Sequence, residues 1–129
     1  MKKKSILSVF VALLFAVSLM ATASEKPGKT HLDKMPDDVK AVIEKSCFGC
    51  HNTGSKNEDA KEALDFKKLD KLSKIQKIGA YKKIGDTIEE GEMPPKKFLE
   101  KYPDRKLTDK EKKLLIEWSK KEAEALVKG

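Results

Sequence analysis

Two cysteines and a histidine stand within one pentapeptide, Cys47-Phe48-Gly49-Cys50-His51, and no other feature constrains this chain as strongly. Residues three and four apart lie on one face of a helical turn, so both thiols and the imidazole can meet a single flat ligand. The spacing C-x-x-C-H is the pattern of c-type haem attachment, in which each thiol adds to a haem vinyl group and the histidine offers Nε2 to the iron. The sequence therefore predicts one covalently attached haem c.

Three interpretations without haem remain open for the same residues. A C-x-x-C pair can be a redox dithiol, although such a pair usually begins a helix after a strand, and no strand is predicted here. A simple disulfide between Cys47 and Cys50 would close too short a loop to add much stability. Alternatively, these cysteines, His51 and the distant His31 could form a Cys₂His₂ zinc site, although the spacing is unlike the usual layout.

The first 23 residues have the layout of a secretory signal peptide. Lys2–Lys4 precede an apolar stretch, Ile6–Met20, and Ala21-Thr22-Ala23 supplies the small residues that favour cleavage before Ser24. The stretch falls short of the roughly 20 apolar residues that span a bilayer. We therefore expect a soluble protein, periplasmic or otherwise exported, that is not embedded in the membrane after cleavage. The alternative is an uncleaved membrane anchor.

The mature chain is poor in apolar residues. Of the 106 residues that follow the signal, only 34 are apolar. A domain this small and this polar usually needs a metal, a cofactor or disulfides to be stable. Haem would supply the missing apolar surface, which agrees with the pentapeptide.

The remaining patterns are helical and predict an all-α fold. We expect a flexible segment over residues 24–35 and one domain over residues 36–129, without sustained period-two alternation. Helices are predicted to begin at Pro36 and at the capping boxes Ser73/Gln76 and Thr108/Glu111, with Phe66, Leu69 and Leu72 in a short helical piece. Their apolar stripes are Val39, Val42, Ile43 and Cys47; Ile75, Ile78, Tyr81, Ile84 and Ile88, ending at Gly91; and Leu114, Leu115, Trp118, Ala125 and Leu126.

Met93 is the predicted second axial ligand. Haem iron in electron carriers is commonly held by His on one face and Met on the other. After signal cleavage only Met35 and Met93 remain, and Met35 lies just 12 residues before Cys47. Pro94 biases Met93 toward extended geometry, so the loop is preset to present its thioether. The alternatives are that Met93 fills the core, that His31 makes a bis-histidine haem, or that the sixth position is open.

The segments Cys47–His51 and Gly91-Glu92-Met93-Pro94-Pro95, followed by a terminal helix with Trp118, resemble a small exported monohaem cytochrome c. The chain is similar in particular to the bacterial haem-binding domain family, with Ser46-Cys47 and Leu107-Thr108-Asp109-Lys110-Glu111 fitting its layout over roughly residues 36–127. The resemblance implies a helical fold wrapped around one haem, with His51 and Met93 as axial ligands. One departure is that Asn52–Lys74 has no proline, so no partner for His51 Nδ1–H can be named.

The function implied by the resemblance is electron transfer rather than catalysis. No Ser-His-acid set, phosphate loop or carboxylate pair indicates an enzyme. A haem sensor or peroxidase-like protein with an open or displaceable sixth site is the alternative. Lys96, Lys97 and Lys101 follow the Met93 loop and predict acidic redox partners. Acidic residues are interspersed throughout, so nucleic-acid binding is not expected, and we expect a monomer.

The packing of the helices can also be predicted. The first and last helices are expected to cross at Val42, Ile43, Leu115 and Trp118. The haem is expected to be surrounded by Phe66, Ile78, Ile84 and Phe98.

Overall fold

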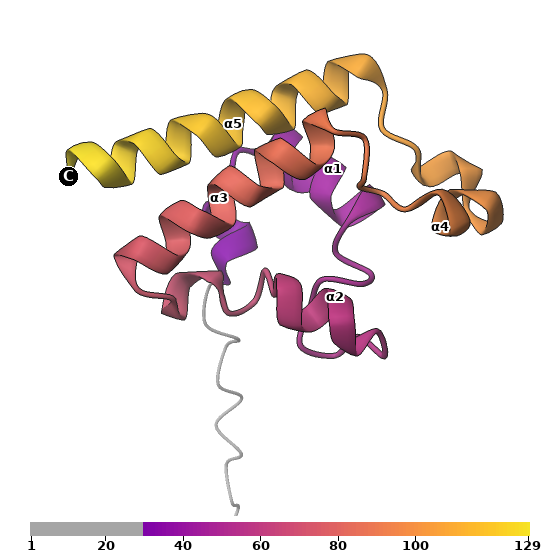
Figure 1. The fold of residues 1–129 in the computed structure, drawn as a ribbon, viewed down its shortest axis with the longest axis horizontal. Helices are drawn as coiled ribbons and strands as arrows, with labels where there is room; N and C mark the ends of the chain where they lie inside the picture. The colour runs from indigo at the N-terminus through magenta and orange to yellow at the C-terminus, as the bar shows by residue number, and fades with distance from the viewer. Residues whose placement is uncertain (1–29) are drawn as a thin grey trace, which may run out of the picture.

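The computed structural model describes residues 30–129, and in that range every regular element is a helix, so the all-α prediction is confirmed (Figure 1). The signal-peptide prediction over residues 1–23 lies outside the described residues. None of the helices between Thr30 and Gly129 has the length and hydrophobicity needed to cross a membrane. The α-helices are α1 Asp37–Ser46, α2 Glu58–Ala63, α3 Lys74–Glu89, α4 Lys96–Lys101 and α5 Asp109–Lys128, and the 3₁₀ turns are η1 His31–Lys34, η2 Leu69–Lys71 and η3 Pro103–Arg105.

The antiparallel helices α3 and α5 form the main packing unit (Figure 1). Both begin at the predicted capping boxes, in which the Ser73 and Thr108 hydroxyls accept from the backbone N–H three residues later. Gly85 lies where the helices approach closely, because a Cβ there would be 2.9 Å from the Ser119 hydroxyl. The buried residues contributed by the two helices are Tyr81, Ile84, Gly85 and Ile88 from α3, and Leu115, Trp118, Ser119 and Ala123 from α5.

Two residues assigned to these apolar stripes are exposed instead. Ile75, in the first turn of α3, is 82% exposed, and Ala125 of α5 is exposed while Ala123 is buried. A helical period identifies residues that face one way, but it does not say how far along the helix its partner reaches. The predicted stripes therefore lie on the buried faces of the helices, but they extend too far at the start of α3 and at the end of α5.

The predicted flexible segment 24–35 is wrong in its described part, residues 30–35. Leu32 and Met35 are buried in the core, and η1 begins at a capping box between Thr30 and Asp33. His31 joins this segment to the domain through hydrogen bonds to Asp70 and Tyr81. The segment was predicted to be flexible because it is mostly polar. However, it contains two apolar residues spaced three apart, which lie on one face of a helical turn and can pack against the core.

The first helix follows the prediction closely. Pro36 is its N-cap, and Val39, Val42 and Ile43 are buried. Helix α1 contacts α5, and the four residues expected at this crossing, Val42, Ile43, Leu115 and Trp118, are all buried. This contact fixes the end of α1, and therefore the start of the pentapeptide, against the α3–α5 pair.

Candidate functional site

The pentapeptide forms a turn directly after α1. Cys47 is the C-cap of α1, and its carbonyl accepts from the N–H groups of Cys50 and His51 at 3.2 and 3.1 Å. The chain thus keeps a helix-like turn although α1 itself ends at Ser46. Cys47, Cys50 and His51 all line one cavity, as the spacing predicts.

Two backbone carbonyls fix the His51 ring. Its Nδ1 lies 2.7 Å from the Ala60 carbonyl oxygen and 3.1 Å from that of Leu64. Carbonyl oxygens only accept, so Nδ1 carries the hydrogen, and in the neutral ring the lone pair is on Nε2. Nε2 has no hydrogen bond to any described residue, and the Phe66 ring packs edge-on against the imidazole. This is the arrangement of a metal-ligating histidine, oriented by a bond from its other nitrogen.

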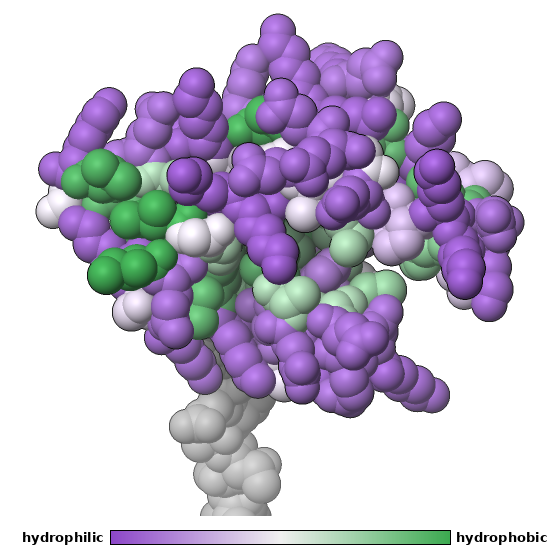
Figure 2. Space-filling view, in the orientation of Figure 1, coloured by the Kyte–Doolittle hydropathy of each residue, from purple (hydrophilic) through white to green (hydrophobic). Residues whose placement is uncertain are grey.

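The cavity lies between the pentapeptide, α2, the Met93 loop and α4. Its larger part has a volume of about 450 Å³, and an adjoining part of about 90 Å³ extends toward α3. Both parts are lined by Cys47, His51, Ile88 and Met93. Figure 2 shows a hollow with hydrophobic atoms inside a mostly hydrophilic surface, between the elements labelled α2 and α4 in Figure 1. The size is typical of a small-molecule or cofactor site.

Met93 reaches this cavity from the loop that follows α3. Gly91 adopts a positive φ of 73° after α3, and the N–H groups of Glu92 and Met93 bond to the Thr87 carbonyl at 2.9 and 3.4 Å. Pro94 is buried and Met93 is partly buried. The fold therefore brings Met93 into the same cavity as His51, although 42 residues separate them along the chain.

His31 is engaged elsewhere. Its Nδ1–H donates to Asp70 at 2.7 Å, and its Nε2 is hydrogen-bonded to the Tyr81 hydroxyl at 2.9 Å. His31 does not line either part of the cavity. Among residues 30–129, no three His, Cys, Asp or Glu side chains are grouped as a metal site, so the four-ligand zinc site is not assembled.

Both cysteines are free thiols. Burial, with a smaller contribution from the neighbouring Cys50, raises the pKa of the Cys47 thiol to about 12. A dithiol redox centre needs a thiolate with a lowered pKa. The environment of Cys47 therefore does not favour this thiol as the attacking thiolate of a redox pair.

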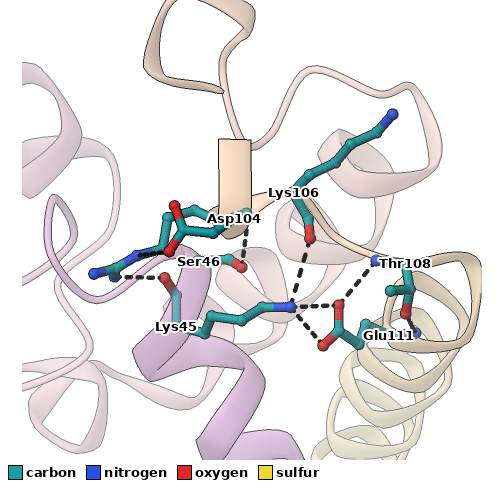
Figure 3. A network of polar contacts seen from close by, with 7 residues as sticks. Lys45, Ser46, Asp104, Lys106, Thr108 and Glu111 are labelled. Carbon is teal, nitrogen blue, oxygen red and sulfur yellow. Dashed lines mark hydrogen bonds and ion pairs between the residues drawn. The ribbon is translucent and has the colours of Figure 1, made fainter. Parts of the chain in front are cut away.

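A polar network fastens the segment after α4 to the end of α1 (Figure 3). Lys45 Nζ lies 2.6 and 2.7 Å from the two carboxylate oxygens of Glu111, and Ser46 Oγ donates to the Arg105 carbonyl at 2.7 Å. Lys45 and the Thr108 N–H hold the pKa of the Glu111 carboxyl below its usual value. The network closes the cavity where Leu107 is buried.

Three of the four predicted wall residues line the cavity. Phe66 and Ile84 line its smaller part and Phe98 its larger part, whereas Ile78 faces a groove between α3 and α5. Sequence analysis missed α2, although Asn57 caps it by accepting from the Ala60 N–H at 3.1 Å. The carbonyls of Ala60 and Leu64 carry no side-chain signal, so only the fold could identify them.

The chain matches the family described as "Haem-binding domain" over residues 55–121. This range includes α2, α3, the Met93 loop and most of α5, and it begins after the pentapeptide. No curated protein and no solved structure matches the chain.

Proposed function

Because this chain belongs to the haem-binding domain family, we propose that it is an exported monohaem c-type cytochrome that transfers electrons. Cys47 and Cys50 would hold the haem through thioethers, and His51 and Met93 would be the axial ligands. In forming each thioether, the thiol sulfur bonds one vinyl carbon and the hydrogen goes to the other, so no oxidant is needed.

One observation carries this proposal: a single cavity is lined by the two thiols, by an imidazole with Nε2 unengaged among the described residues, and by a methionine from a distant loop. These are the donor types of c-type haem with His/Met ligation. Because the pentapeptide and the Met93 loop both line this cavity, a flat ligand bound in it could contact both segments.

The bound haem would supply the one-electron chemistry of its iron. The chain's part is to position it and to shield it from water. The Ala60 and Leu64 carbonyls fix the plane of the His51 ring, while Phe66, Ile84 and Ile88 make one side of the cavity apolar. A thioether ligand and a dry pocket both favour the ferrous state and raise the reduction potential.

The partners in this proposal are proteins with acidic docking surfaces. Lys96, Lys97 and Lys101 are exposed on α4 and make no ion pair with another described residue. Lys97 lines the cavity itself. Such charges mainly raise the association rate, so electron transfer to an acidic partner should slow steeply as salt increases, measured by stopped flow. A rate that does not respond to salt would remove the steering role.

The deciding experiment is to produce the full chain in a host that matures c-type cytochromes and to examine the secreted protein. We expect a red product whose haem survives acid–acetone extraction, and a mass equal to the processed chain plus one haem. A colourless protein of bare polypeptide mass would refute the proposal. Readily reversible reduction without peroxidase turnover would support a carrier rather than an enzyme, and carbon monoxide binding at neutral pH would favour a sensor.

A further inference from the structure

Arg105 is the only arginine among the 28 basic residues of the chain, and it lines the larger part of the cavity. It ends η3, and its Nη1 donates to the Lys45 carbonyl at 2.8 Å. Its own carbonyl accepts from Ser46 Oγ at 2.7 Å. Arg105 is therefore fixed from two directions to the end of α1, two residues before Cys47.

The guanidinium group of Arg105 has N–H donors that make no hydrogen bond to a described residue. A guanidinium carries five N–H donors in a rigid plane. Among the described residues, the Lys45 carbonyl accepts a hydrogen bond from one of these donors. Asp104 is 3.6 Å from Nε, but its side chain is 77% exposed, which makes this ion pair weak. Lys45, another cation at the cavity, is neutralised by Glu111. Arg105 is thus the fixed positive group at this wall, and Lys97 is the exposed one.

The position of Arg105 fits the boundary between an apolar ligand and water. The wall beside it contains Met93, Pro94, Phe98 and Leu107, while the Arg105 side chain is 42% exposed. A carboxylate that leaves water at such a boundary needs a charged hydrogen-bonding partner. Arginine meets a carboxylate with two parallel N–H groups, which none of the lysines can do.

We propose that Arg105 binds a propionate carboxylate of the haem through its guanidinium group. This inference rests on the proposed function, because the carboxylate belongs to the haem. Arg105 would then link the ligand to the same stretch of backbone that carries Cys47. A carboxylate on the edge of an otherwise apolar plane suits a cavity that is lined by Met93, Pro94, Phe98 and Leu107 and to which Arg105 adds a guanidinium group.

The test compares Arg105→Gln, Arg105→Lys and the control Lys97→Gln, which removes one charge from the same cavity. Each matured, haem-loaded protein is measured by its haem content, by its reduction potential and by the propionate bending band in the resonance Raman spectrum. We expect Arg105→Gln to shift the Raman band and lower the potential, since an uncompensated carboxylate favours ferric iron. Arg105→Lys should restore part of both, and Lys97→Gln should leave the band unchanged.

A wild-type Raman band in Arg105→Gln, with a potential no lower than that of Lys97→Gln, would overturn the inference and leave Arg105 as a clamp on the Lys45 carbonyl. If Arg105→Gln does not accumulate, Arg105→Lys decides: a shifted band supports the inference, and a wild-type band refutes it. A wild-type protein without haem would refute the proposed function instead, so the two failures are distinguishable.

Discussion

The two histidines of this protein lie in opposite kinds of environment. His31, on the side of the α3–α5 pair, uses both ring nitrogens in bonds to Asp70 and Tyr81. His51, on the cavity side, uses only Nδ1 and faces a cavity. On the His31 side the histidine is held by side chains of the core, whereas on the His51 side the two thiols, the imidazole and Met93 line one cavity. The difference supports the proposed haem site on the His51 side.

The aromatic residues near His31 and near His51 differ in the same way. Behind His31, the Tyr81 ring meets Trp118 edge-on at 5.4 Å between centroids. Around His51, Phe66 is buried, but the side facing the imidazole opens into the smaller part of the cavity. The aromatic rings near His31 pack against each other, whereas the residues around His51 line the proposed haem site.

Exchanging the two histidines for alanine should give the largest contrast. His51→Ala removes the proposed iron ligand and should abolish normal haem ligation, measured by the visible spectrum and by haem content. His31→Ala should keep the wild-type spectrum but lower the free energy of unfolding by about 1–3 kcal/mol, because the buried Tyr81 hydroxyl and Asp70 lose a partner. A wild-type spectrum in His51→Ala would contradict the assignment of the two sides.

The two methionines outside the signal segment allow a similar test. Met35 is buried in the core, so Met35→Ala should cost about 2–5 kcal/mol of unfolding free energy while leaving the reduction potential unchanged. Met93→Ala should retain covalent haem, lower the potential and allow carbon monoxide to bind the reduced protein. If Met93→Ala left the visible spectrum unaltered, the proposed ligand would be wrong.

Two glycines of α3 test the importance of the contact between α3 and α5. Gly85→Ala should destabilise the fold by about 1–3 kcal/mol, because the new Cβ would meet the Ser119 hydroxyl at 2.9 Å. Gly79→Ala meets nothing within 4 Å and should stabilise α3 by about 0.5–1 kcal/mol. Thermal and denaturant unfolding measure both changes. Equal effects at the two positions would show that the close approach of α3 and α5 is not important.

The last expected effect depends on pH. Lys34 and His31 hold the pKa of the Asp70 carboxyl below its usual value. Because the folded pKa is lowered, this stabilisation is present above the unfolded pKa of about 4 and is lost as pH falls through the folded value. Asp70→Asn should therefore cost about 1 kcal/mol near pH 7 and converge with wild type below about pH 4. Asp86→Asn, at an exposed carboxylate of α3 without a described ion pair, is the control and should show no such convergence.

Much of the local structure could be predicted from residue patterns. The capping boxes at Ser73 and Thr108 mark the starts of α3 and α5, and Pro36 marks α1, because these signals act within one turn. The docking of Leu32 and Met35 and the exposure of Ile75 could not be predicted, since they depend on which partner surface is present. Helix α2 had a signal in Asn57, which accepts from the Ala60 N–H at 3.1 Å, but its short polar sequence lacks an apolar period.

The candidate site also has one part that could be predicted from the sequence and another that depends on the tertiary structure. The pentapeptide by itself predicts the attachment chemistry and one axial ligand that we propose, because residues three and four apart lie on one face of a helical turn. Only the tertiary structure decided that Met93 faces the same cavity, that His31 is used elsewhere, and that the carbonyls of Ala60 and Leu64 orient His51. These are contacts between residues distant in the chain or made by the backbone, and their geometry exists only once the helices have packed.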